Sequence, residues 1–172
     1  MLKLETPKYK FCPFCGNKLK ARTEEEHIRK YCPICNWAYY PHVATTAGAV
    51  IVKKGRVLMV KRNRPPYKGT WMFPAGFVDY GEHPEETIRR EVQEETGLKV
   101  TKTSFIGVWQ VEDDPRARGH FIFFYNASVS EGDIATDLEE NEEIAWQDIG
   151  HPPVIGWKRH QEVMKMLQKK RA

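Results

Sequence analysis

The stretch GFVDYGEHPEETIRREVQEETGL, residues 76–98, decides the fold of this 172-residue chain and carries most of its chemistry. Pro84 suits the first position of a helix, where an N–H group would have no partner within the helix, and Gly97 suits the position just past the last turn. Between them, Ile88 and Val92 repeat with helical spacing. We therefore predict a helix that begins at Pro84 and ends before Gly97.

Three acidic residues of this helix fall on one face. Glu91, Glu94 and Glu95 are spaced i, i+3 and i+4, and their like charges raise one another's pKa unless a cation neutralises them. Mg²⁺ takes carboxylate oxygens as ligands and keeps waters and substrate phosphates as the others. Arg90 is within reach of Glu82 or Glu94 and can hold one carboxylate by two hydrogen bonds. From the three glutamates alone, a solvated acidic helix face remains an equal alternative.

The same stretch resembles the Nudix box at every defining position. The resemblance implies hydrolysis of a pyrophosphate linked to a nucleoside, with Mg²⁺ or Mn²⁺ as the catalytic cofactor. It also implies that the backbone carbonyl of Ala75 binds this metal together with the three glutamates, and that Glu82 holds Arg90 in place. The matching positions are Gly76, Glu82, Arg90, Glu91, Val92, Glu94, Glu95, Gly97 and Leu98.

The general base is less defined. Glu95 can serve, but in many members of the family that this chain resembles a carboxylate from a later loop does so. An acidic stretch at residues 137–143 precedes Trp146, where such a loop is expected, and it offers Glu140 and Glu143. A solvated loop carboxylate is the alternative for each of these two. The candidate catalytic residues are therefore Glu94, Glu95, Arg90, Glu143 and Glu140.

All four cysteines lie near the N-terminus, as two C-x-x-C pairs. Cys12 and Cys15 are separated by sixteen residues from Cys32 and Cys35, a spacing typical of a tetrahedral zinc site. Two disulfides or a redox pair are the rival interpretations. The chain shows no secretion signal, so we expect it in the reducing cytoplasm, where disulfides are disfavoured. Four thiolates complete the shell of Zn²⁺, which would therefore be structural.

Composition limits the partners. Hydrophobic residues make up 41% of the chain, enough for one core and a small appendage, and no apolar run is long enough to cross a bilayer. The formal net charge of +4 is modest and does not require nucleic acid. We expect a small-molecule nucleotide as substrate and neither a membrane nor a nucleic-acid partner.

The order of elements predicts an α/β fold with a mixed sheet covered by helices. The Nudix resemblance makes this an α/β/α sandwich, which a small zinc ribbon precedes. We assign residues 9–41 to the ribbon and residues 42–172 to the Nudix domain. The remaining expected elements are a hairpin of strands 43–52 and 56–61, strands at 100–111, 120–129 and 143–147, and an amphipathic helix at 155–170.

Four residues outside the box are candidates for substrate binding. Arg62 and Arg64 lie just before the box and can offset phosphate charge. Trp71 and Trp109 can line a cleft and stack on a nucleobase, although the hydrophobic core is the commoner place for each.

The whole chain resembles the zinc-ribbon Nudix proteins, a group that contains NADH pyrophosphatases and hydrolases of FAD or ADP-ribose. The segments FCPFCG, YCPICN and GTWMFPAGFVDYGE carry this resemblance together with the box. The SQPWPFP-like segment of the NADH pyrophosphatases is replaced by VTKTSFIGVW, whereas Pro115 lies near a proline typical of ADP-ribose hydrolases. The resemblance thus favours ADP-ribose or a dinucleotide such as FAD or NADH, and it allows a homodimer. The alternatives are a nucleoside triphosphate pyrophosphatase and a non-catalytic module that binds nucleotides or nucleic acid.

Overall fold

The computed structural model describes residues 9–135 and 141–171, and the chain divides into two compact units, Met1–Val43 and Ala44–Ala172. The first unit contains a three-stranded antiparallel sheet. Its strands are β1 (Lys20–Glu24), β2 (His27–Tyr31) and β3 (Ala38–Tyr39).

The second unit is built on two β-sheets. One has the order β8-β4-β10-β9, and because β4 and β10 are parallel while the other pairs are antiparallel, this sheet is mixed. The other has the order β11-β6-β5, with β7 paired to β6. The strands are β4 (Thr45–Val50), β5 (Val52–Lys53), β6 (Arg56–Arg62), β7 (Trp71–Met72), β8 (Ala75–Phe77), β9 (Val100–Gln110), β10 (Phe121–Val129) and β11 (Asn141–Asp148).

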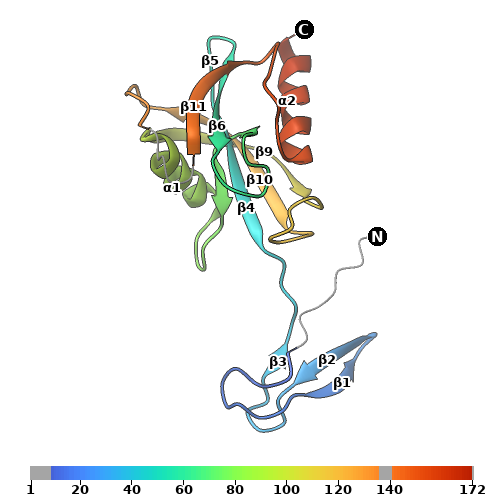
Figure 1. The fold of residues 1–172 in the computed structure, drawn as a ribbon. Coiled ribbons are helices and arrows are strands. Elements are labelled where there is room, and N and C mark those ends of the chain that lie inside the picture. Colours follow the sequence, from blue (N-terminus) through green and yellow to red (C-terminus); the bar gives the residue numbers. More distant parts are fainter. Residues whose placement is uncertain (1–8, 136–140, 172) are drawn as a thin grey trace. The chain divides into compact units, whose positions relative to one another are not determined.

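Two helices, α1 (Pro84–Thr96) and α2 (Lys158–Arg171), lie on opposite sides of these sheets, which gives the expected α/β/α sandwich (Figure 1). The ends of α1 are those predicted. Pro84 is its first residue, and Gly97 caps it in the left-handed conformation at φ 73°. The side chain of His83 accepts a hydrogen bond at the N-terminus, a cap that the sequence did not suggest. The last helix begins at Lys158, three residues later than predicted.

The core forms two clusters, one against each helix. Ile88 and Val92 of α1 pack with Leu58 and Tyr125 in one of them. Val163 and Met164 of α2 belong to the other, which also contains the large buried rings Phe73, Phe124 and Trp157. The sheets therefore pack against a hydrophobic cluster on each face.

The predicted strand at 43–52 is divided in the structure. Its first part, β4, pairs with β8 and β10, whereas its last residue, Val52, begins β5, which pairs with β6 in the other sheet. Only β5 and β6 form the expected hairpin, and Lys54 and Gly55 turn it at φ 49° and 74°. Almost all of β4 is buried, because a strand with neighbours on both edges and a cluster beneath it has no exposed face.

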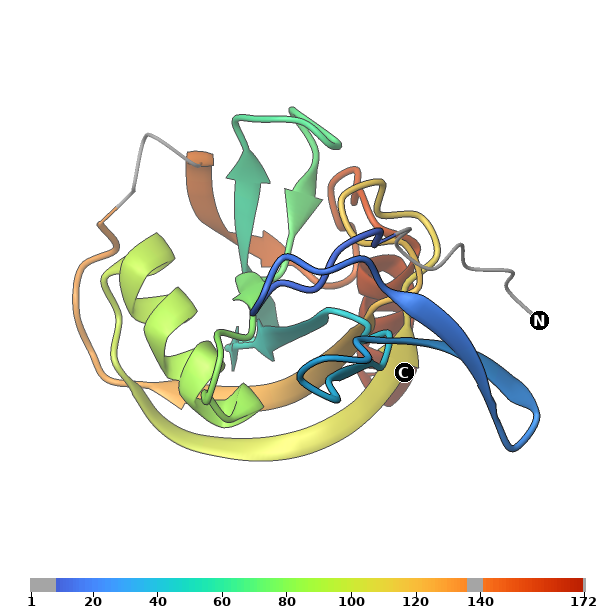
Figure 2. The same cartoon turned by 90° about the horizontal axis from the view of Figure 1, so that it is seen from below.

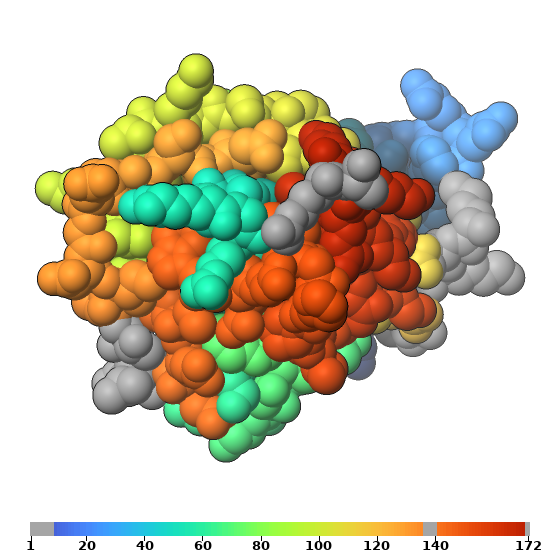
Figure 3. Space-filling model, turned by 90° about the horizontal axis from the view of Figure 1, so that it is seen from above, coloured from blue at the N-terminus to red at the C-terminus, as the bar shows by residue number. Residues whose placement is uncertain are grey.

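The strands predicted at 100–111 and 120–129 are confirmed as β9 and β10, and β9 is a long bent strand at the edge of its sheet (Figure 2). The strand predicted at 143–147 is confirmed as β11. From above, β11 in orange and α2 in red form much of one face of the second unit (Figure 3). Within the described part of the chain, no helix is both long and apolar enough to cross a membrane.

Candidate active site

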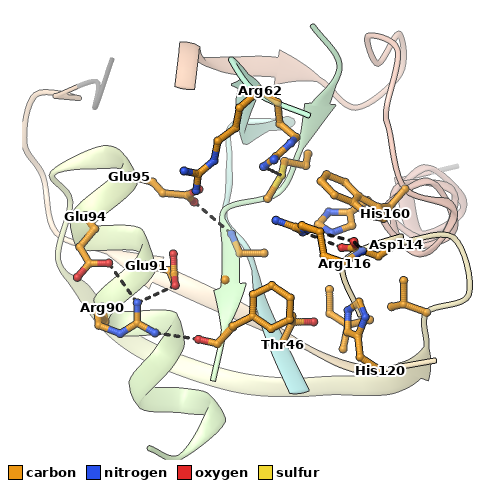
Figure 4. A pocket seen from close by; sticks show the side chains of 18 of the residues that line it. Thr46, Arg62, Arg90, Glu91, Glu94, Glu95, Asp114, Arg116, His120 and His160 are labelled. Atoms are coloured by element: carbon orange, nitrogen blue, oxygen red, sulfur yellow. Dashed lines mark hydrogen bonds and ion pairs between the residues drawn. The ribbon is translucent and has the colours of Figure 1, made fainter. Parts of the chain in front are cut away.

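A cavity of about 400 Å³ lies beside the acidic face of α1. Its two ends carry different residues, as Figure 4 shows. One end, here called the acidic end, is lined by Ala75, Gly76, Arg90, Glu91, Glu94 and Glu95. The opposite end, here called the far end, is lined by Asp114, Arg116, His120, Trp157 and His160, with Val111 and Ile122.

Helix α1 brings the three candidate metal ligands to the acidic end. Glu95 is 6% exposed, and its Oε2 accepts a hydrogen bond from the backbone N–H of Ala75 at 3.1 Å. The side chain of Glu91 is 14% exposed and that of Glu94 is 57% exposed. The three carboxylates therefore extend from a buried position beside β8 to the open mouth of the cavity.

Arg90 neutralises this cluster from one side. Its Nε and Nη2 donate to the two oxygens of Glu82, each at 3.0 Å, and its Nη1 donates to Glu91 at 2.7 Å and to Glu94 at 3.1 Å. Nη2 also donates to the carbonyl of Phe77 at 3.0 Å. The hydrogen bonds from Arg90 lower the pKa of Glu82 to about 2, and those to Glu82 and Glu91 raise the pKa of Arg90. Arg90 thus ties α1 to β8 and holds charged carboxylates in a fixed arrangement.

Gly76 allows β8 to approach α1 closely. A Cβ atom at this position would overlap the carboxylate of Glu91, so only glycine fits without displacing that side chain. The backbone of β8 and the carboxylates of α1 consequently meet at one end of the cavity. Their donor atoms are all oxygens, the type that a hard divalent cation such as Mg²⁺ prefers.

The far end contains an ion pair that the sequence did not reveal. Asp114 is 2% exposed, and its two oxygens accept hydrogen bonds from Arg116, at 3.0 Å from Nε and 2.7 Å from Nη2. Burial opposes ionisation of Asp114, but the hydrogen bonds from Arg116 outweigh it and lower the pKa of Asp114. The Cζ atom of Arg116 lies 5.3 Å from the ring centre of Phe77 and 5.6 Å from that of Trp157.

His160, on α2, is another residue of the far end that the sequence analysis missed. It is 3% exposed, and its Nδ1 accepts a hydrogen bond from the backbone N–H of Phe73 at 3.2 Å. Burial lowers the pKa of His160 to about 3, so the ring is neutral. A lone histidine within the apolar stripe of a helix resembles an ordinary core residue, and no sequence signal could have placed it at a cavity.

The four predicted substrate-binding residues are divided between the cavity and the core. Arg62 and Arg64 line the cavity, and the Cζ atom of Arg62 lies 5.0 Å from the ring centre of Trp157. Trp71 is buried at 8% exposure and Trp109 packs against the core, and neither is among the lining residues. The aromatic side chains at the cavity are instead Phe77, which follows Gly76, and Trp157, which precedes α2.

The two loop carboxylates were named as candidates for the general base. Glu143 is exposed on β11 and does not line the cavity, and Glu140 lies outside the described residues. The third candidate, Glu95, is buried at the acidic end.

The first unit brings its four cysteines together. The sulfur atoms of Cys12, Cys15, Cys32 and Cys35 all lie within 4.8 Å of one another, although the cysteines are far apart in the sequence. Gly16 and Asn36, which follow the two C-x-x-C pairs, adopt positive φ angles of 71° and 52°. This arrangement is that of a zinc ribbon, and its donor set suits a soft tetrahedral metal ion.

Known proteins are similar to this chain in sequence and in fold. A family model described as NUDIX domain matches residues 41–167. The chain is 34% identical over 154 residues to an ADP-ribose pyrophosphatase of Methanocaldococcus jannaschii, a match that covers 88% of each chain. It is 31% identical over 147 residues to the NAD-capped RNA hydrolase NudC of Chromobacterium violaceum. That match covers 84% of this chain but only 52% of the relative, so the chain spans about half the length of NudC.

Two solved structures show the same fold. A NUDIX hydrolase from Nitrosomonas europaea has a TM-score of 0.76 and 23% identity, over 95% of this chain and 93% of the other. The NUDIX domain of Shewanella oneidensis NrtR, solved with ADP ribose, has a TM-score of 0.65 and 20% identity, over 83% and 94% of the two chains. Given an intact box at one end of a cavity and a family model that matches most of the sequence, the chain belongs to the NUDIX hydrolase family.

Proposed function

We propose that this protein hydrolyses the pyrophosphate bond of ADP-ribose, or of a dinucleotide such as FAD or NADH, and releases a nucleoside monophosphate. One observation carries the proposal: Glu91, Glu94 and Glu95 all line one end of a cavity that Arg62 and Arg64 also line. Carboxylates and arginines around one cavity suit a metal-bound pyrophosphate, because the metal and the guanidinium groups share its negative charge.

The acidic end suits Mg²⁺ or Mn²⁺. Glu91, Glu94 and Glu95 would hold the ion with the backbone carbonyl of Ala75, and Gly76 leaves the space that this close approach needs. When bound, a divalent ion withdraws charge from the phosphate oxygens and makes water a better nucleophile at neutral pH.

The protein's own groups then position the reactants. Arg90 holds the carboxylates of Glu91 and Glu94 in place by hydrogen bonds, and its two bonds to Glu82 fix the orientation of its own guanidinium. Arg62 and Arg64 bind phosphate oxygens and stabilise the charge that develops during attack at phosphorus.

Glu95 is the candidate general base that the described cavity supports. Its carboxylate is itself one of the proposed metal ligands and is buried at the acidic end, where an oxygen that does not bind the ion could accept a proton from an attacking water. Glu140 and Glu143 remain predictions for this role.

The cysteine cluster would hold structural Zn²⁺. Four thiolates complete a tetrahedral shell and leave no open position for a substrate or a water. The first unit has only a small three-stranded sheet, so the metal would supply much of its stability. The cytoplasmic location and the homodimer stay predictions.

ADP-ribose is the preferred substrate because the relative that matches the chain over most of its length is named an ADP-ribose pyrophosphatase. A product screen tests this choice: ADP-ribose, NADH, FAD, diadenosine polyphosphates and nucleoside triphosphates, each with Mg²⁺ or Mn²⁺. We expect the highest kcat/KM for ADP-ribose, with AMP and ribose 5-phosphate as products. Preferential release of pyrophosphate from nucleoside triphosphates would instead assign nucleoside triphosphates as the substrates. Failure to hydrolyse any of them would favour a non-catalytic module.

A further inference from the structure

The far end of the cavity contains a hydrogen-bond donor, on a largely buried histidine, that the proposed chemistry does not use. A backbone N–H can only donate, so the bond from Phe73 makes Nδ1 of His160 an acceptor. Because the ring is neutral, its single proton must then be on Nε2. The tautomer of His160 is therefore fixed, with an Nε2–H donor.

This donor is directed to the cavity. His160 lines the cavity, although the residue is only 3% exposed. Within residues 9–135 and 141–171, its Nδ1 accepts from Phe73 and no group accepts a hydrogen bond from its Nε2. A donor that opens onto a cavity and has no acceptor in the protein is available to a bound molecule that supplies one. His160 is thus prepared to receive an acceptor atom from a bound molecule.

The surroundings of His160 are mainly buried apolar and aromatic side chains, and Arg62 and His120 also lie near it. Val111 and Ile122 are 2% and 3% exposed, and Trp157 borders them. The guanidinium of Arg116 is held in one orientation by its two hydrogen bonds to Asp114, and its side chain is still 39% exposed. The rings of Phe77 and Trp157 lie near the same guanidinium, 5.3 and 5.6 Å from its Cζ atom, and flat groups of this kind suit a further aromatic ring.

A sugar fits this environment less well than a heteroaromatic ring. A ribose diol needs acceptors such as exposed carboxylate oxygens, but Asp114 is only 2% exposed and its oxygens already accept three hydrogen bonds from Arg116. Nδ1 of His120 is likewise engaged with the carbonyl of Ala117, at 2.7 Å. A nucleobase offers both a flat face for Arg116 and a ring nitrogen or carbonyl for His160.

We propose that the far end is the nucleobase subsite, in which Nε2–H of His160 donates to the base and Arg116 stacks on it. This assignment rests on the proposed function, because it places the base at the end of the cavity away from the metal ligands. His160 would then contribute to the affinity for the nucleoside half of the substrate. The residues of α1 would act on the pyrophosphate, at the other end of the cavity.

Two substitutions of His160 separate binding from structure. Asparagine in His160→Asn can keep an acceptor for the N–H of Phe73 but does not reach as far as Nε2. Glutamine in His160→Gln reaches as far as Nε2 with an N–H donor, but gives up the acceptor close to Phe73. A binding role thus predicts a larger loss of ligand affinity for His160→Asn, whereas a purely structural role predicts the larger loss of stability and affinity for His160→Gln.

The test is calorimetric titration with AMP and with ribose 5-phosphate, the two products expected from ADP-ribose, in the presence of Mg²⁺. We expect His160→Asn to weaken AMP binding about tenfold and His160→Gln to weaken it by less, while the affinity for ribose 5-phosphate stays unchanged. Equal AMP affinities in all three proteins would overturn the proposal. So would a loss that appears with ribose 5-phosphate instead, which would assign the far end to the sugar half. Because binding is measured without turnover, a wild-type protein that binds AMP through His160 but hydrolyses nothing would refute only the proposed function.

Discussion

Arg90 donates two hydrogen bonds of 3.0 Å to the two oxygens of Glu82, and the same guanidinium also donates to Glu91, the next residue, and to Glu94, one turn further along α1. One side chain therefore orients a loop carboxylate and two candidate metal ligands together. Lysine, a point charge with three rotatable donors, cannot reproduce this planar arrangement.

We accordingly predict that Arg90→Lys lowers kcat/KM by about tenfold to a hundredfold, the effect of one or two lost charge-assisted hydrogen bonds. Arg89→Lys is the matched control, because Arg89 is exposed and donates only to the carbonyl of Val100 among the hydrogen bonds described. Steady-state kinetics with ADP-ribose measures both variants. Equal kinetics for Arg90→Lys and Arg89→Lys would show that Arg90 does not position the site.

Glu82 gives a second prediction, on stability in acid. Its pKa is lowered from 4.5 to about 2 in the folded protein, mainly by Arg90, so the unfolded chain takes up this proton first as the pH falls. The stabilisation is complete above pH 4.5 and is lost as the pH falls towards 2. Wild type should therefore exceed Glu82→Gln in free energy of unfolding by about 1–3 kcal/mol at pH 7, and by progressively less below pH 4.5. Urea unfolding at a series of pH values measures the difference, and a difference that does not change with pH would refute the linkage.

Gly76 supplies a steric prediction. In Gly76→Ala the new methyl group must displace the carboxylate of Glu91, so kcat should fall by at least about tenfold while the protein stays folded. Gly132→Ala is the control, since a Cβ atom there meets only Leu98, at an ordinary contact distance of 3.6 Å. Comparable activity of the two variants would mean that the close approach of β8 to α1 is not needed.

Replacing Glu94 and Glu95 with glutamine tests whether their carboxylates are needed for catalysis. Glu94→Gln and Glu95→Gln remove one charge each and keep the shape of the side chain, so we expect each to lower kcat by about two to three orders of magnitude without unfolding the chain. Glu85→Gln, on the same helix but outside the cavity lining, should retain wild-type activity. Near-normal turnover in Glu94→Gln and Glu95→Gln would remove these residues from the site.

The cysteine cluster predicts one tightly bound Zn²⁺ per chain. Elemental analysis of the purified protein should find it, and Cys32→Ala, which removes a buried ligand, should lose most of it. A strong chelator should release zinc and unfold the first unit, with loss of the exchange protection of its strands. Wild-type protein that contains no zinc, yet keeps these strands protected, would contradict the assignment.

The sequence was most informative where the determinants are local. The start and end of α1 follow from Pro84 and Gly97, and the acidic face follows from helical spacing, because each depends on neighbours within a few residues. The two C-x-x-C pairs also predicted a cysteine cluster, although the pairs are separated in the chain. Four cysteines in this spacing supply all the ligands of a tetrahedral zinc ion, and this made the prediction possible.

Features that depend on distant partners were not predictable in the same way. The segment at 43–52 is divided between two sheets because β10, some seventy residues later, pairs with β4. The far end of the cavity brings Asp114 and His120 from the loop before β10 together with His160 from α2. Tryptophans near the box suggested a base-stacking role, but Trp71 belongs to the core, and the fold brings Trp157 to the cavity instead.

The most direct test of the central claim is the release of AMP and ribose 5-phosphate from ADP-ribose, measured with Mg²⁺ and with the metal removed by a chelator. The account predicts equimolar products with Mg²⁺, little or none without it, and a loss of both in the double variant Glu94→Gln/Glu95→Gln. Release of AMP at the wild-type rate by that double variant in the same assay would contradict it.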